Sequence, residues 1–161
     1  MNKTILALGL SAVLGSAAWA APAPVQKCAA ADVQGSWQIY SFQEQVPGDA
    51  TAYARKYPYR YILFMPNGTF FNFSATKLPD AKIFGWGRSH PVGSYALRDS
   101  GNDRLLLLSF SDGRREDLKC SRFIAAQGSV KAGDVVLQGY NMQNPSRQKS
   151  MTTQYLRKVN K

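Results

Sequence analysis

Apolar and polar side chains alternate along most of the chain with the period of two that is typical of β-strands. The pattern is clearest in residues 33–39, where Val33, Trp37 and Ile39 are separated by polar or small side chains. At Tyr40 the apolar phase reverses, which predicts a β-bulge or a bend. This segment is therefore expected to be a strand with one face turned toward a core.

A second segment predicts a β-hairpin. Residues 59–65 and 69–74 are rich in aromatic and β-branched side chains, and Pro66, Asn67 and Gly68 lie between them. Proline presets φ for the first turn position, and Asn-Gly supplies the positive φ that a tight hairpin needs.

The rest of the chain continues in the same way. Residues 50–56 are expected to form a short helical turn of the kind that caps a barrel mouth, and residues 77–91 a long loop with at most one short strand. Further strands are predicted at 93–98, 104–110, 114–126, 134–142 and 149–159. Short turns between eight or nine strands predict an all-β fold, namely an antiparallel up-and-down barrel.

The strand that contains Leu105 to Leu108 is apolar on both faces. One face would lie in the core, and the other needs cover from water. The cover comes either from this chain, through a loop or the N-terminal arm, or from another subunit.

The first twenty residues have the features of a signal peptide. Lys3 is followed by a short apolar run from Ile5 to Val13, and residues 18–20 are Ala-Trp-Ala. The run is shorter than the roughly 20 residues that span a bilayer, so we expect no transmembrane segment. The expected organisation is a signal peptide at 1–20, an N-terminal arm at 21–31 and one barrel domain at 32–161, in a periplasmic or secreted protein.

Two cysteines, Cys28 and Cys120, are the only ones in the chain. Export would place them in an oxidising compartment, where a single disulfide is the default expectation. That bond would join the N-terminal arm to a late strand.

These residues resemble the lipocalin family, within the broader calycin superfamily. Gly35-Ser36-Trp37 is similar to the Gly-x-Trp motif that opens the first strand of that family, and the hairpin at 61–71 resembles one common in small bacterial lipocalin-like domains. Arg157, in the last predicted strand, corresponds to an arginine that packs over the motif tryptophan. The resemblance implies that Gly35, Trp37 and Arg157 are structural, with Arg157 over the indole at the closed end of the barrel.

The chain is strongly basic, with 20 lysines and arginines against 10 aspartates and glutamates, a formal charge of +10. Since Lys3 is the only charged residue in the first twenty, the exported chain would carry +9. Such a field favours anionic partners. The basic residues are scattered, and export argues against a nucleic-acid partner.

Catalytic groups are sparse. His90 is the only histidine, and Glu116 and Asp117 are adjacent, so they would face opposite sides of a strand. With both cysteines assigned to a disulfide, a metal centre lacks ligands. We therefore expect no enzyme activity, no metal and no cofactor.

An eight-stranded barrel has an interior able to hold one small ligand. The first hypothesis is binding of an apolar or amphipathic small molecule, with anionic molecules included. Phe84 and Trp86 would form the mouth, Arg88 would meet an acidic head group, and Tyr59 and Tyr61 would contribute aromatic surface. The alternative is an envelope interaction protein without a ligand cavity, whose basic surface docks on lipopolysaccharide, phospholipid or an acidic partner protein.

Overall fold

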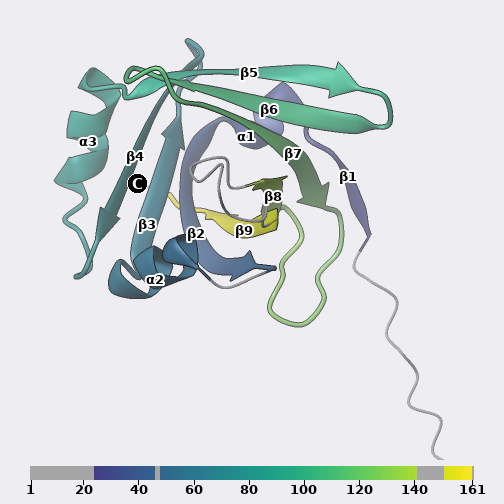
Figure 1. The fold of residues 1–161 in the computed structure, drawn as a ribbon, viewed down its shortest axis with the longest axis horizontal. Helices are drawn as coiled ribbons and strands as arrows, with labels where there is room; N and C mark the ends of the chain where they lie inside the picture. The colour runs from purple at the N-terminus through teal and green to yellow at the C-terminus, as the bar shows by residue number, and fades with distance from the viewer. Residues whose placement is uncertain (1–23, 46–47, 141–150, 161) are drawn as a thin grey trace, which may run out of the picture.

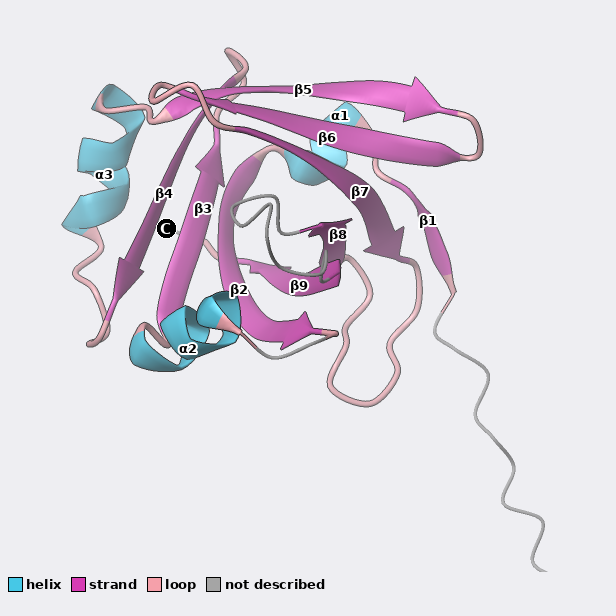
Figure 2. Ribbon diagram, in the orientation of Figure 1, coloured by secondary structure: helices cyan, strands magenta, loops and turns pink. Residues whose placement is uncertain are grey.

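The computed structural model describes residues 24–45, 48–140 and 151–160 (Figure 1). Eight antiparallel strands close into a barrel, a ninth short strand extends the sheet, and three short helices accompany the barrel (Figure 2). The predicted barrel is confirmed. The expected signal peptide, residues 1–20, lies outside the described residues.

The strands are β1 (Val25–Lys27), β2 (Gly35–Glu44), β3 (Tyr59–Phe64), β4 (Thr69–Ala75), β5 (Gly93–Ser100), β6 (Asp103–Phe110), β7 (Arg115–Phe123), β8 (Val135–Tyr140) and β9 (Met151–Lys158). The helices are α1 (Ala30–Val33), α2 (Asp49–Lys56) and α3 (Lys82–Ser89). From β2 to β9 each strand pairs with the next, and β9 pairs with β2 to close the ring.

The bulge predicted in the first barrel strand is confirmed. The pairing of β2 with β9 shifts in register between Ile39 and Ser41. Trp37 and Ile39 therefore belong to the barrel core, whereas the Tyr40 hydroxyl donates to Asp134, which is not part of that core. The reversal of the apolar phase in the sequence is thus a local insertion and not a strand end.

The predicted hairpin is also confirmed, with six residue pairs between β3 and β4. The Met65 amide donates to the Thr69 carbonyl at 2.9 Å, which leaves a three-residue turn. Gly68 alone in this turn has positive φ, at 80°. Asn67 contributes differently from the prediction, because its side-chain oxygen accepts the Thr69 amide at 3.1 Å.

Strands β4 and β5 pair over only a short length. These strands share two residue pairs, Thr69 with Ser94 and Phe70 with Gly93, compared with eight between β5 and β6. β4 continues to Ala75, so its second half has a strand partner on the β3 side alone among the described residues. Strand pairing in the barrel wall is therefore interrupted beside this part of β4.

The prediction of a loop at 77–91 is wrong, because Lys82–Ser89 forms helix α3 on the outside of β3 and β4 (Figure 1). Gly85 and Gly87 lower the intrinsic helix propensity of this segment. A Cβ on Gly87 would lie 2.2 Å from a ring carbon of Phe71, so Gly87 is what allows the helix to approach the sheet. Apolar contacts with Leu63, Phe71 and Phe73 then stabilise a helix of low intrinsic propensity.

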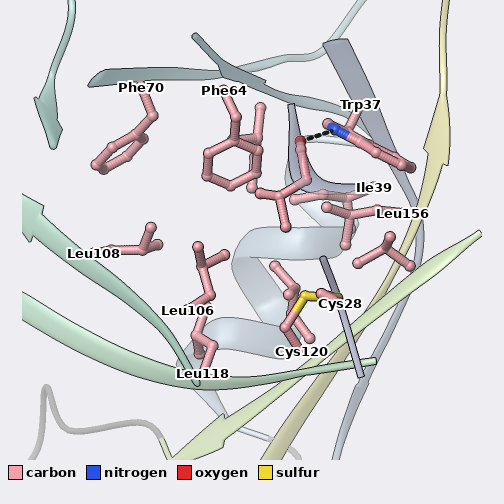
Figure 3. Packing of buried hydrophobic residues seen from close by; sticks show 14 residues of the cluster. Cys28, Trp37, Ile39, Phe64, Phe70, Leu106, Leu108, Leu118, Cys120 and Leu156 are labelled. Atoms are coloured by element: carbon pink, nitrogen blue, oxygen red, sulfur yellow. Dashed lines mark hydrogen bonds between the residues drawn. A yellow bond between two sulfur atoms is a disulfide. The ribbon is translucent and has the colours of Figure 1, made fainter. Parts of the chain in front are cut away.

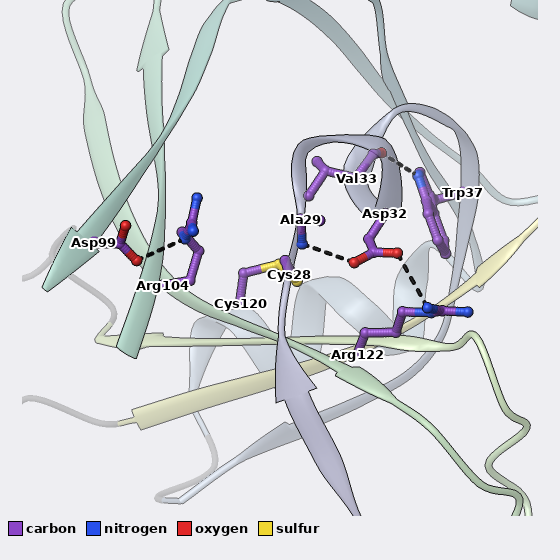
Figure 4. The surroundings of a disulfide bond; sticks show 9 residues. All are labelled: Cys28, Ala29, Asp32, Val33, Trp37, Asp99, Arg104, Cys120 and Arg122. Atoms are coloured by element: carbon purple, nitrogen blue, oxygen red, sulfur yellow. Dashed lines mark hydrogen bonds and ion pairs between the residues drawn. A yellow bond between two sulfur atoms is a disulfide. The ribbon is translucent and has the colours of Figure 1, made fainter. Parts of the chain in front are cut away.

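The ninth strand is β1, in the N-terminal arm, and not in residues 77–91 as the sequence had indicated. β1 pairs with residues 121–123 of β7, beyond the part of β7 that pairs with β6. The predicted disulfide between Cys28 and Cys120 is confirmed, with Cα atoms 5.6 Å apart and both residues buried (Figure 4). The arm is thereby joined to β7 by hydrogen bonds and by a covalent bond.

The N-terminal arm does not lie over the second apolar face of β6, since it extends the sheet at the edge of β7. Leu106 and Leu108 are buried in the core, and Leu105 and Leu107 are half-buried on the other face. Lys119 and Asp117 lie opposite these two leucines on β7. Flanking charged side chains thus limit the exposure of this face.

The interior of the barrel is filled at one end by a single apolar cluster (Figure 3). Trp37, Phe64, Leu106 and Leu156 are at most 2% exposed. The Trp37 indole N–H donates to the Val33 carbonyl at 2.6 Å, so its polar atom is satisfied by α1. Apolar side chains therefore fill the barrel interior beside α1.

Candidate functional site

The other end of the barrel contains a cavity of about 730 Å³. Its lining residues come from α2 and from strands β2, β3, β4, β6, β7 and β9. Ligand pockets for small molecules measure about 300 to 1,000 Å³, so this volume suits one such ligand. The cavity meets the apolar cluster at Ile39, Ile62, Phe70, Leu108 and Leu118, which form its floor.

Helix α2 lies at the rim of this cavity, where Asp49, Ala50 and Tyr53 contribute to the lining. Its first turn is tied to the end of β2, because one carboxylate oxygen of Glu44 accepts the Thr51 amide at 3.1 Å and the Thr51 hydroxyl at 2.8 Å. The helical turn predicted at 50–56 is therefore confirmed, and it borders the open end of the barrel.

Arg60 is the charged side chain that β3 directs into the cavity. Its Nε atom is buried without a hydrogen-bond partner, and its guanidinium carbon lies 5.1 Å from the centre of the Phe42 ring. Burial lowers the pKa of Arg60, and the nearby Tyr53 acts in the opposite direction. A guanidinium remains protonated under such conditions, so Arg60 places a positive charge in a partly apolar cavity.

Glu116, on β7, is the acidic counterpart. Burial raises the pKa of its carboxyl, and the charge of Arg114 partly opposes that shift. Arg114 has partners of its own, since its Nε donates to Asp112 at 2.8 Å and its guanidinium carbon lies 4.3 Å from the Phe110 ring centre. Uncharged polar groups complete the lining, contributed by Asn72, Ser74 and Gln154.

The structure does not bring the five predicted ligand residues together at this cavity. Phe84 is 1% exposed and packs edge-on against Tyr61 and Phe73, on the outer side of the barrel. Trp86 is half exposed, beside Phe71. These aromatic residues do not border this cavity, because the segment that carries them is a helix packed on the sheet from outside, and their role in ligand binding stays a prediction.

Of the predicted residues, Tyr61 alone lines the cavity, at its margin. Side chains of successive strand residues lie on opposite faces of the sheet. Because Arg60 and Ile62 point into the barrel, the side chains of Tyr59 and Tyr61 leave the strand on the outer face. Arg88 lies elsewhere, in a solvent-open groove that Leu63, Met65 and Lys158 also line.

The resemblance to lipocalins placed Arg157 over Trp37, and this prediction is also wrong. Trp37 pairs in register with Lys158, whose ammonium lies 5.5 Å from a ring centre of the indole. Arg157 lies over the Tyr40 ring at 4.4 Å and donates to Asp134 at 2.6 Å and 3.0 Å. Arg157 and Lys158 are neighbours in β9, so their side chains lie on opposite faces of the strand. The register of β2 and β9 places Lys158, and not Arg157, opposite Trp37.

His90 ends helix α3, and its ring stacks on Trp86 at 4.1 Å between centroids. Its Nδ1 atom lies 2.9 Å from the Trp86 carbonyl oxygen. Across the described ranges, no group of three or more histidine, cysteine, aspartate or glutamate side chains is placed to hold a metal ion. The expected lack of enzyme activity stays a prediction.

Sequence reasoning missed Arg60 and Glu116 as site residues, although the signal was present. Each alternates in phase with a residue of the barrel core on its own strand, Arg60 with Ile62 and Glu116 with Leu118. A charged residue at an inward position is an exception to the alternation, and such exceptions mark functional sites.

No protein-family model, curated protein or solved structure matches this chain. The closed eight-stranded barrel is compatible with a lipocalin-like fold. The disulfide is typical of proteins from oxidising compartments outside the cytoplasm. Among the helices that the structure describes, none has the length and apolar character to cross a bilayer.

Proposed function

We propose that this protein binds an amphipathic small molecule in the cavity at the open end of its barrel, in the periplasm or after secretion. The observation that carries the proposal is the cavity itself, about 730 Å³ in volume, with an apolar floor and polar side chains nearer its rim. Such a division matches a ligand with an apolar body and a polar group.

The interrupted strand pairing beside the second half of β4 supports the proposal. Asn72 and Ser74 line the cavity on this side, and Phe110 and Glu116 line it from β6 and β7. After Phe70 no strand hydrogen bonds join β4 to β5, so this side of the cavity is not closed by strand pairing.

A binding measurement on the exported form tests the proposal. The probe is the neutral apolar dye N-phenylnaphthylamine, whose emission rises in apolar surroundings. In Asn72→Trp, the added ring occupies the cavity, and we expect dye affinity to fall at least about tenfold. Ala96→Trp adds the same ring on the exposed face of β5, where Ala96 pairs with Leu107, and should bind like the parent protein.

Salt dependence separates this function from surface docking. Binding of a neutral dye should change little between low and moderate ionic strength, whereas docking of a basic surface on anionic vesicles should weaken strongly. The proposal fails if neither the dye nor any fatty acid or alcohol binds, or if both tryptophan variants reduce dye binding equally.

A further inference from the structure

Two groups of opposite charge face the same cavity. Arg60 comes from β3 and Glu116 from β7, and both line the cavity. In the closed ring β3 and β7 are four strands apart in either direction, so the two groups come from opposite walls. No ion pair joins them, and neither contributes to the pKa shift of the other.

Neither charge is compensated within the described part of the chain. The contacts of Arg60 are with the ring of Phe42 and, more weakly, with Tyr53. Glu116 experiences the field of Arg114, whose guanidinium is already paired with Asp112. Both side chains are half-buried, and partly buried charges without an ion pair are costly, so such groups are candidates for functional sites.

Other polar groups of the cavity do not supply the missing partners. Asp49, at the first turn of α2, also lines the cavity and is engaged in an interaction of its own. Its carboxylate does not contribute to the pKa shift of Arg60. The two charges therefore lie on opposite walls of the cavity without an ion-pair partner among the described residues.

Resting on the proposed function, we propose that the ligand is bipolar, with an acidic group that binds Arg60 and an amine or hydroxyl group that binds Glu116. A guanidinium presents a planar set of donors that suits a carboxylate, often through two parallel hydrogen bonds. A carboxylate accepts hydrogen bonds from ammonium and hydroxyl groups. The apolar body of the ligand would lie on Ile62, Phe70 and Leu108.

Four probes of equal chain length measure each end of the ligand separately: dodecanol, dodecanoate, ω-hydroxydodecanoate and ω-aminododecanoate. Their affinities are obtained by displacement of N-phenylnaphthylamine. We expect dodecanoate to bind about tenfold or more tightly than dodecanol, and the ω-substituted acids to bind more tightly than dodecanoate.

Two variants assign these preferences to residues. Arg60→Met keeps most of the side-chain volume and should abolish the preference for dodecanoate over dodecanol. Glu116→Gln should abolish the preference for ω-aminododecanoate over dodecanoate. The matched controls are Arg98→Met and Asp117→Asn, which remove the same charges from exposed positions on the outer face and should leave both preferences unchanged.

Equal binding of dodecanol and dodecanoate by the parent protein would overturn the acidic end of the proposal. Equal effects of Glu116→Gln and Asp117→Asn would overturn the other end. In either case, continued displacement of the dye by dodecanol would leave the proposed cavity function intact, so the two proposals fail separately. Retained dye binding by Arg60→Met and Glu116→Gln shows that the variants are folded.

Discussion

Removal of the Asp134 carboxylate is the most direct test of the polar contacts that join the first and last strands of the barrel, β2 and β9. Asp134 precedes β8 and is 3% exposed. It accepts the Arg157 guanidinium at 2.6 Å and 3.0 Å, the Tyr40 hydroxyl at 3.0 Å and the Lys131 amide at 2.9 Å. One carboxylate thus connects β2, β9 and the segment before β8.

The expected cost follows from this geometry. Loss of one partner of a buried ion pair costs about 3 to 5 kcal/mol. The Arg157 side chain is 32% exposed, so water recovers part of its hydration. We therefore expect Asp134→Ala to lower the free energy of unfolding by about 2 to 3 kcal/mol. Arg157→Met should cost less, about 1 to 2 kcal/mol, because Tyr40 and Lys131 still donate to the carboxylate.

Equilibrium unfolding in urea, followed by circular dichroism, measures both variants and their combination. The double-mutant cycle should give a coupling of about 1 to 2 kcal/mol between Asp134 and Arg157. Arg115→Met, which removes an exposed charge, should change stability by less than about 0.5 kcal/mol. A coupling no larger than the effect of that control would refute the assignment of Arg157 to this network.

The same network predicts an acid limit to stability. Burial alone would raise the pKa of Asp134, but hydrogen bonds from Arg157, Lys131 and Tyr40 outweigh it and hold the pKa below its usual value. A lowered folded-state pKa contributes stability that is complete above the unfolded value and is lost as the pH falls through the folded value. The parent protein should therefore lose stability below about pH 4 more steeply than Asp134→Ala.

Three further outcomes are expected. Replacing Cys28 and Cys120 by alanine removes a cross-link between positions 92 residues apart and should cost about 4 to 5 kcal/mol in urea unfolding; a loss below about 1 kcal/mol would contradict the loop-entropy argument. Gly87→Ala forces a methyl group to within 2.2 Å of the aromatic ring beneath α3 and should lower stability by about 1 to 3 kcal/mol in thermal melts. Gly85→Ala, which meets nothing within 4 Å, is its control and should be neutral or stabilising. Burial, with the hydrogen bond to Asp134, raises the pKa of Tyr40 to about 12, so its stabilising contribution should persist to about pH 10 and disappear as the pH rises through 12. If an ultraviolet titration of Tyr40→Phe shows the same high-pH transition as the parent protein, this prediction is wrong.

The strand pattern could be predicted because it depends on neighbours in the chain. The period of two determines which side chains share a face, and the turn at Pro66 to Gly68 needs a residue that tolerates positive φ. The bulge at Tyr40 and the disulfide also followed from local pattern and residue type. Up-and-down closure then followed from the number of strands and the short turns between them.

Helix α3 could not be predicted from local signals. Its glycines lower helix propensity, and the reason for Gly87 becomes visible only against Phe71, from another element. β1 was missed for a related cause, since three residues carry no periodic signal and its pairing with β7 depends on a partner almost a hundred positions away. Propensity is a weak guide wherever tertiary contacts decide.

The sequence by itself determined the strands of the closed barrel, the hairpin turn and the cysteines available for a cross-link. Tertiary structure alone decided that Arg60 and Glu116 share one cavity and that Lys158, not Arg157, meets Trp37. The physical reason is that alternation fixes only the side of the strand on which a residue lies. Which residues meet across the barrel depends on ring closure and register, and these are set by pairing between strands far apart in the chain.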